Sequence, residues 1–416
     1  MLASGKEPTY RTIVAMAAIC FCASSVVAGP FSQLVVFGDS LSDIGNIADA
    51  TLGIYPGRYY FDDRFSNGPV FVEALSEGLG LGAPLPSTDG GNNFAYGGAR
   101  TFGTGGFEGL FIRDVDEQVD QFLATRTADP GALFLVYAGS NDLVGGETNV
   151  NIPAGSLAED IGRLAAAGAR HFLVPSLPPL GHTPRFNGSP ATFADYNQRA
   201  AEFNAAFDTM LDDLEMANSA LQFFRLDVAA LFSAAVADPA AFGLSNVTDA
   251  AAPGLLPGAS SYNTSQIAPN AHEYLFWDDL HPTATVHAAL AEQALALFVV
   301  PGDYSDDGTV DAADYVVWRK TEGLTGSGLA ADGNGDEMVD ALDYHLWRAN
   351  FGNSVGAASL AATGARSASH ASRLGEPTAA VPEPGGLWLL AAALSVIAAS
   401  RQTTRREVLH VNARRE

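Results

Sequence analysis

Residues 29–300 alternate between short apolar runs and longer stretches in which apolar residues recur at helical spacing. The short runs are bounded by turn residues, which is typical of strands buried in a parallel sheet. They are QLVVF (33–37), ALFLVYAG (132–139), RHFLVPSL (170–177) and LQFFRLDV (221–228). The helical stretches lie at 69–80, 157–169, 189–218 and 284–299, whereas the glycine-rich residues 82–107 show no regular pattern. Strands that alternate with helices predict a three-layer α/β/α fold with a parallel sheet covered on both faces.

Residues 302–352 follow a different pattern, an internal repeat with a period of 29 residues. The segment DYSDDGTVDAADYVVWR (303–319) matches DGNGDEMVDALDYHLWR (332–348). Each copy spaces oxygen-bearing residues as a calcium loop does, and Ca²⁺ takes about 6–8 oxygen ligands. A helix-like segment with aromatic residues follows each loop, and Trp318 and Trp347 within these segments are expected to lie in a core. An acidic, solvated spacer is the alternative to two calcium sites.

The expected calcium ligands occupy equivalent positions in the two loops. They are Asp303, Ser305, Asp307, the Thr309 carbonyl, Asp311 and Asp314 in the first loop, and Asp332, Asn334, Asp336, the Met338 carbonyl, Asp340 and Asp343 in the second. Gly308 supplies the sharp turn of the first loop, and Glu337 stands at that place in the second. Because this position favours positive φ, we expect the second site to be weaker.

The duplicated loop–helix unit resembles a type I dockerin. The resemblance implies a small all-α module that binds two structural Ca²⁺ ions and docks to a cohesin-like module. It implies no role for calcium in catalysis.

Both ends of the chain read as sorting elements. Residues 1–28 contain the apolar stretch TIVAMAAICFCASSVV and small residues before Gly29, which predicts a secretory signal peptide. Both cysteines lie inside it, so the exported protein has no thiol or disulfide chemistry. Residues 353–380 are rich in alanine, serine and glycine and predict a flexible linker.

Residues 381–406 combine a Pro-Glu-Pro stop, a short apolar run and three arginines. The run is shorter than the roughly 20 residues of a full membrane span. This segment resembles a PEP-CTERM sorting signal, which implies export and processing by exosortase machinery. A simple transmembrane tail anchor is the alternative, so secretion and attachment to the cell envelope or outer surface both remain open.

Length and charge limit the partners. The 416 residues exceed one ordinary domain. The formal net charge of -25 repels phosphates and argues against a nucleic-acid partner.

Candidate chemistry starts at Ser40, in the polar turn that follows the first apolar run. A serine hydroxyl becomes a nucleophile only with a base in hydrogen-bond reach and an acid that orients the base. FWDDLHPTA (276–284) supplies both, because Asp278 and His281 are three residues apart and can lie on the same side of one turn. An oxyanion also needs donors, and the Ser40 amide, the Asn141 side chain and a glycine amide of NFAYGGA (93–99) could provide them.

These blocks resemble the GDSL lipases and esterases, also called SGNH hydrolases: FGDSLSDIGN, NFAYGGA, GSND and DDLHP occur in the family's order. The resemblance covers residues 33–290 and implies an α/β/α hydrolase domain over 29–300. It implies Ser40 as nucleophile, Asp278 and His281 as its partners, and Ser40, Gly97 and Asn141 as oxyanion donors, with Gly98 as the alternative glycine. The G-x-S-x-G elbow of other α/β hydrolases is absent from the sequence.

The sequence therefore predicts an exported serine ester hydrolase, and its substrate stays open between a lipid and an acetylated polysaccharide. A carbohydrate acetylesterase attached to a polysaccharide-degrading system is one alternative. A catalytically silent surface binding protein that keeps the fold is the other.

Overall fold

The computed structural model describes residues 29–355 of the chain. The expected signal peptide (1–28), the sorting segment (381–406) and all but the first residues of the expected linker lie outside the described residues. The centre of the molecule is a four-stranded parallel sheet in the order β1-β2-β3-β4. Its strands are β1 (Leu34–Gly38), β2 (Leu133–Tyr137), β3 (His171–Pro175) and β4 (Gln222–Leu226). All four predicted strands are confirmed.

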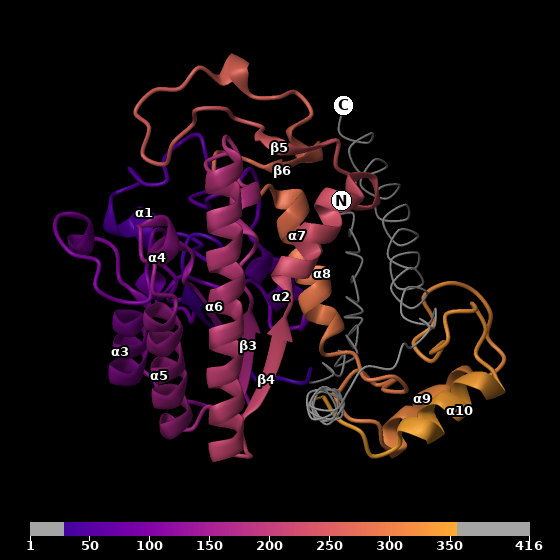
Figure 1. Cartoon of the computed structure of the whole chain (residues 1–416). Coiled ribbons are helices and arrows are strands. Elements are labelled where there is room, and N and C mark those ends of the chain that lie inside the picture. The colour runs from indigo at the N-terminus through magenta and orange to yellow at the C-terminus, as the bar shows by residue number, and fades with distance from the viewer. Residues whose placement is uncertain (1–28, 356–416) are drawn as a thin grey trace, which may run out of the picture.

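Helices cover both faces of this sheet (Figure 1). They are α2 (Phe71–Gly78), α3 (Val115–Thr125), α5 (Asn151–Ala167), α6 (Pro190–Ala217), α7 (Val228–Ala237) and α8 (Ala284–Ala296). Phe122 of α3 packs on Phe134 of β2, whereas Phe71 of α2 packs on Tyr137 of the same strand. Because residues of opposite parity point to opposite faces of a strand, α3 and α2 lie on opposite sides of the sheet. The predicted α/β fold is confirmed.

Aromatic side chains fill the α3 side of the sheet. Phe134, Phe172 and Phe223 are paired in register on β2, β3 and β4, and their ring centroids lie 5.8 and 5.5 Å apart. All three are buried, and burial of a phenylalanine side chain is worth about 1.5–3 kcal/mol. Each of these phenylalanines belongs to one of the apolar runs from which the strands were predicted.

Several elements were not predicted from the sequence. The run 221–228 was expected to be a strand throughout, but α7 begins at Val228 because the Asp227 side chain caps it by accepting from the Ala230 amide at 2.9 Å. A second, two-stranded parallel sheet pairs β5 (Asn246–Ala250) with β6 (Tyr274–Phe276). The remaining short elements are α1 (Asn46–Ala50), α4 (Ser140–Val144) and the 3₁₀ turns η1 (Ser87–Asp89), η2 (Glu108–Leu110), η3 (Leu180–His182), η4 (Pro239–Phe242), η5 (Thr264–Gln266) and η6 (Ala271–Glu273).

Residues 92–96 extend the sheet beyond β1 without forming a full strand. The amide of Val36 donates to Asn92 O at 2.9 Å, and the amides of Phe94 and Tyr96 donate to Val36 O and Gly38 O at 2.7 and 3.1 Å. This is the pattern of a parallel pair. The glycines that follow Tyr96 therefore lie at the same edge of the sheet as the residues that follow β1.

The repeated segment forms a pair of helices, α9 (Ala312–Thr321) and α10 (Ala341–Asn350), which lie side by side (Figure 1). The two copies contact each other reciprocally. The Trp318 indole donates to Asp340 O at 2.8 Å, and the Trp347 indole donates to Asp311 O at 2.7 Å. Trp318 is buried, as expected, and Trp347 is half-buried.

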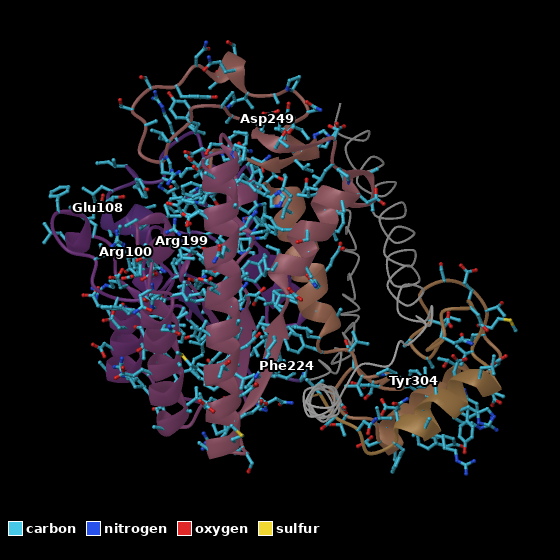
Figure 2. All side chains as sticks on the ribbon, in the orientation of Figure 1. Arg100, Glu108, Arg199, Phe224, Asp249 and Tyr304 are labelled. Carbon is cyan, nitrogen blue, oxygen red and sulfur yellow. The ribbon has the colours of Figure 1, made fainter. Side chains whose placement is uncertain are left out.

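Tyr304 connects the two loops next to these helices (Figure 2). It is buried, and its hydroxyl donates to Asp343 O at 2.7 Å. The unit does not end where the linker was expected to begin, because the Val310 amide donates to Asn353 O and the Val355 amide donates to Gly308 O, both at 2.8 Å. Residues 353–355 therefore belong to this unit.

Within residues 29–355, no helix is long and apolar enough to cross a membrane.

Candidate active site

Three side chains distant in sequence form one continuous series of hydrogen bonds. The Nε2 atom of His281 lies 3.0 Å from Ser40 Oγ, and the two residues are 241 positions apart. On the other side of the ring, His281 Nδ1 lies 2.8 Å from Asp278 Oδ2. Ser40 and His281 are 5% and 6% exposed and Asp278 is fully buried, so water barely reaches the series.

The turn that carries Ser40 is fixed from both directions. The amides of Ser42 and Asp43 donate to Asp39 O, which closes the turn directly after β1. The Gln118 side chain of α3 accepts from the Gly38 amide at 2.8 Å and donates to Gly38 O at 2.9 Å. Gln118 thereby fixes the end of β1, a role that the sequence analysis missed.

Two asparagines join this turn to residues 92–96. Asn46 Nδ2 donates to Asn93 O and Ala95 O at 2.8 and 2.9 Å, and Asn93 Nδ2 donates to Ser42 O at 2.7 Å. Both asparagines stand in motif blocks quoted above, and their side-chain amides donate to backbone carbonyls, while Asn46 Oδ1 also accepts from the Ser87 hydroxyl at 3.0 Å. They hold two chain segments in register, and the sequence analysis assigned them no role.

The structure reverses the preference between the two adjacent glycines. The Gly97 amide, expected to be an oxyanion donor, donates to the Asp43 carboxylate at 2.7 Å and so is committed within the protein. A β-carbon at Gly97 would lie 2.1 Å from the Phe65 ring, so close packing excludes any larger residue there. Among the described residues, no acceptor is found for the Gly98 amide or the Ser40 amide. Gly98, with φ +85°, is therefore the better candidate for the glycine amide that donates to the oxyanion.

Asn141 lies near the same edge of the sheet, in α4 after β2. Its side-chain amide donates to Ala99 O at 2.8 Å and has a long 3.5 Å contact with Asp39 Oδ2. Gly139 precedes α4 with φ +114°, and a β-carbon there would lie 2.7 Å from the Phe203 ring. Gly139 thus allows the sharp entry into the helix that presents Asn141.

Asp278 and His281 belong to one tight turn that β6 positions. The Trp277 amide donates to His281 O at 2.8 Å and the Thr283 amide to Leu275 O at 3.0 Å, so the chain doubles back on itself. Asp278 Oδ1 accepts from the amides of Leu280 and His281. These bonds orient the carboxylate so that its other oxygen faces the imidazole.

The other histidines in the described part of the chain lie outside this series. His287 is buried in α8 and accepts from the Phe71 amide at 3.2 Å, and burial lowers the pKa of His287 to about 3. His182 packs edge-on against Phe193 at 4.8 Å, and His171 opens β3.

A model of the GDSL-like Lipase/Acylhydrolase family matches residues 34–294. The chain belongs to this family. It is accordingly a hydrolase that acts on ester bonds, and the region that carries the family match includes Ser40, Asp278 and His281.

Several curated proteins are similar to this GDSL hydrolase. Phosphatidylcholine-sterol acyltransferase of Aeromonas hydrophila is 28% identical, over 64% of this chain and 89% of the relative. Esterase EstA of Pseudomonas aeruginosa is 29% identical, over 69% of this chain and 50% of the relative. A GDSL esterase/lipase of Arabidopsis thaliana is 29% identical, over 64% of this chain and 82% of the relative.

Solved structures that resemble the GDSL hydrolase share little sequence with it. A lipolytic G-D-S-L family protein from Veillonella parvula is 15% identical with a TM-score of 0.36, over 64% of this chain and 97% of that one. Acetylxylan esterase Axe2 from Geobacillus stearothermophilus is 12% identical with a TM-score of 0.36, over 65% and 95%.

The expected calcium ligands lie in two loops with similar backbones. Within residues 29–355, no three His, Cys, Asp or Glu side chains converge as a metal site would require. Asp314 Oδ1 accepts from the amides of Tyr304 and Ser305, and Asp343 Oδ1 accepts from the equivalent amides of Gly333 and Asn334.

The sharp turns of the two loops are equivalent as well. Glu337 has φ +63° where Gly308 has φ +86°, which confirms the expected positive φ at this position. Asp306 and Gly335 likewise share positive φ two residues earlier.

Three further carboxylates surround the site, and burial raises the pKa of each. The values are about 7 for Asp39 and about 6 for Asp43 and Asp142. Asp43 accepts from four backbone amides, and Asp142 accepts from both the amide and the hydroxyl of Thr101. These groups stabilise the backbone around the site and do not touch Ser40.

Asp39 makes the stability of the fold depend on pH. Its pKa is raised from 3.8 to about 7, so between these values the native state keeps a proton that the unfolded chain has released. Stability then falls as pH rises, by about 1.4 kcal/mol for each pH unit in that window, and the loss is complete above about pH 7. We expect Asp39→Asn to remove this dependence.

Thermal melts between pH 4 and 9 measure the effect. The melting temperature of Asp39→Asn minus that of the wild type should rise from pH 4 to about 7 and stay constant above it. Asp89→Asn, a substitution at an exposed position outside the site, is the control. Parallel melting curves for wild type and Asp39→Asn would contradict the assignment.

Proposed function

We propose that the chain cleaves carboxylic esters through an acyl-enzyme formed on Ser40. The observation that carries the proposal is the unbroken series from Ser40 Oγ through His281 to Asp278, at 3.0 and 2.8 Å. His281 Nε2 removes the hydroxyl proton as Ser40 Oγ attacks the ester carbonyl. The alcohol then leaves with that proton, and the acyl group remains on Ser40. Water, deprotonated by His281, releases the acid and restores the serine.

The negative oxygen of each tetrahedral intermediate needs preorganised donors. We assign the amides of Ser40 and Gly98 and the side chain of Asn141 to this role. The first two have no acceptor within the described residues, and the 3.5 Å contact from Asn141 to Asp39 is weak enough for a substrate oxygen to replace it. Each such donor is worth on the order of 3 kcal/mol in the transition state.

Substitution of the series tests the mechanism directly. Ser40→Ala and His281→Ala should each reduce the turnover of p-nitrophenyl esters by at least about 10³-fold, and the two losses should be similar because the groups act as a unit. A fluorophosphonate probe should label the wild type and not Ser40→Ala. A wild type that neither turns over esters nor takes up the probe would favour the silent binding protein, and undiminished turnover by Ser40→Ala would remove the serine mechanism.

An apolar rim beside the candidate donors favours a fatty acyl group over acetate. We define the rim as Leu52, Ile54, Phe107 and Leu110, which are 91%, 67%, 76% and 73% exposed. Exposed apolar patches are typical of ligand or lipid contact, and we propose that these four residues act as one. Glu108, which lies between Phe107 and Leu110 in the chain, stands at the left edge of the molecule in Figure 2.

Residues close to the rim in the chain approach the site in two places. Leu110 and Ile112 line a cavity of about 440 Å³ together with the polar residues Asp49, Arg113 and Glu117, and a β-carbon on Gly98 would lie 3.0 Å from Ile112. The Tyr55 ring lies 5.4 Å from Phe65, which itself lies 5.1 Å from the His281 ring. An acyl chain that leaves the carbonyl on the Gly98 side therefore meets apolar surface.

Chain-length preference separates this proposal from a carbohydrate acetylesterase. The wild type should hydrolyse p-nitrophenyl octanoate with a higher kcat/KM than the acetate. The double substitution Phe107→Ser/Leu110→Ser should lower the octanoate-to-acetate ratio by about tenfold. Met216→Ser, at an exposed apolar residue far along α6, is the control. Preference for acetylated glycans, unaffected by the rim substitutions, would favour the acetylesterase.

We propose that residues 302–355 bind two Ca²⁺ ions in the manner of a type I dockerin. The donor set suits a hard cation, since each loop offers carboxylate, carbonyl and hydroxyl or amide oxygens. The matching positive φ angles and the matching amide contacts of the last aspartate in each loop support two sites with the same backbone arrangement. The first loop would hold its ion through Asp303, Ser305, Asp307, Thr309, Asp311 and Asp314. Calcium would stabilise the unit, which would present a surface to a cohesin-like partner.

Calorimetric titration of the full chain with Ca²⁺ should give two sites of unequal affinity, with the Glu337 loop the weaker. Asp307→Asn should abolish one site, whereas Asp306→Asn, its neighbour outside the ligand pattern, should leave both. A chain that binds no calcium, or equal losses from the two substitutions, would remove the calcium assignment.

Export remains a proposal that depends on residues outside the described range. We propose that residues 1–28 direct secretion and that 381–406 engage sorting machinery, which leaves the hydrolase at the cell envelope or released from it.

A further inference from the structure

A tyrosine hydroxyl contacts the oxygen of Asp278 that faces His281. Tyr60 donates to Asp278 Oδ2 at 2.6 Å, and the same oxygen lies 2.8 Å from His281 Nδ1. Tyr60 is 6% exposed and Asp278 is fully buried, so no water can readily replace the phenol. The two residues are 218 positions apart in the chain.

The contact completes the coordination of a buried charge. Asp278 Oδ1 accepts from the amides of Leu280 and His281, which belong to the same turn as the carboxylate. Tyr60 is the donor that comes from a different part of the chain. Burial would raise the pKa of Asp278, but the charge of His281 and hydrogen bonds from His281 and Tyr60 outweigh it and hold that pKa below its ordinary value.

The phenol is restricted to the role of donor. Burial, followed by the nearby charge of Asp278, raises the pKa of Tyr60, so its proton stays in place at any pH at which the fold is stable. An ionised carboxylate accepts and does not donate. The direction of the hydrogen bond is therefore fixed from Tyr60 to Asp278.

The segment around Tyr60 is held by a second piece of chain. The Tyr60 ring packs in a cluster with Trp277, Ala251, Ala252 and Leu255. The neighbouring Tyr59 hydroxyl accepts from the Tyr262 amide at 3.0 Å. Tyr60 therefore presents its hydroxyl from a rigid wall built by residues 55–62 and 251–262.

We propose that Tyr60 is a positioning residue, which holds the Asp278 carboxylate in the orientation that His281 needs and shares the negative charge of Oδ2. This inference rests on the proposed Ser40–His281–Asp278 mechanism. The Tyr60 hydroxyl donates to Asp278 and not to Ser40, so in this proposal it acts through Asp278.

Other titratable groups face the pair and must be considered in any pH profile. Asp39 and His287 act on His281 through space, from the Ser40 turn and from α8. Tyr55 and Arg185 lie close enough to feel the charge of Asp278, and Arg185 is paired with Asp279 at 3.0 Å. None of these groups is altered by a substitution at Tyr60.

Tyr60→Phe in the full chain tests the proposal, because it removes the hydroxyl and keeps the ring. Without the donor, Oδ2 carries more charge and the His281–Asp278 pair holds an added proton more tightly. The acid limb of the kcat/KM profile should move to higher pH, and the downfield proton resonance of the His281 Nδ1–H should shift. At the pH optimum, kcat should fall about tenfold with KM nearly unchanged.

Tyr315→Phe is the control, since it removes an exposed phenol of α9 that lies outside residues 55–62 and 251–262. It should leave both the acid limb and the resonance in place. If Tyr60→Phe lowers activity but moves neither signal, the residue only packs and the proposal is wrong. The His281 proton resonance can be measured without any turnover. A failure of the positioning role is therefore distinguishable from a failure of the proposed function, because in the latter case the wild type itself would cleave no ester.

Discussion

The parallel pairing of β1 with β2 on one side and with residues 92–96 on the other determines where the site can form. Parallel neighbours end at a common edge of the sheet. The turn after Gly38, the glycines after Tyr96 and α4 after Tyr137 must therefore lie together. Neither Ser40 nor Gly98 nor Asn141 needs contacts of its own to reach this edge. Their positions follow from backbone hydrogen bonds in the sheet.

The pairing of the strands brings Ser40, Gly98 and Asn141 to one edge of the sheet but does not by itself fix the positions of their atoms. A second set of hydrogen bonds does this. Asp43 accepts from amides on both sides of the site, those of the Ser40 turn and that of Gly97. Asn46 and Asn93 cross-link the same two segments through backbone carbonyls. A shift of one segment would break several buried hydrogen bonds at once, and each costs about 1–3 kcal/mol when a buried group is left without a partner. The site is therefore preorganised by its backbone.

The sequence predicted the strands well because their apolar runs are continuous and bounded by turn residues. It missed α3, whose exposed face is polar, and it extended β4 into α7 because Val228 continues an apolar run that only the Asp227 cap interrupts. The residues of the Ser40–His281–Asp278 series were predicted from their motif blocks. The family resemblance favoured Gly97 over Gly98 as the oxyanion donor, whereas the folded position of Asp43 commits the Gly97 amide and favours Gly98. The contact from Tyr60 to Asp278 leaves no local signal, since it spans 218 positions.

The carboxylates around the site are all buried, but their pKa values are shifted in opposite directions, because their hydrogen-bond partners differ. Asp39, Asp43 and Asp142 are buried among backbone amides and neutral side chains, and burial raises the pKa of all three. Asp278 is at least as buried, yet its pKa is lowered, because it alone is hydrogen-bonded to a side chain that can become a cation. Neutral dipoles only partly offset the loss of hydration, whereas an imidazolium at 2.8 Å adds direct charge attraction. A carboxylate that only orders the backbone can be protonated in the native state, but one that must stabilise an imidazolium has to stay ionised. Environments that give chemically identical groups different pKa values are typical of active sites. Here they distinguish Asp278 from the neighbouring carboxylates.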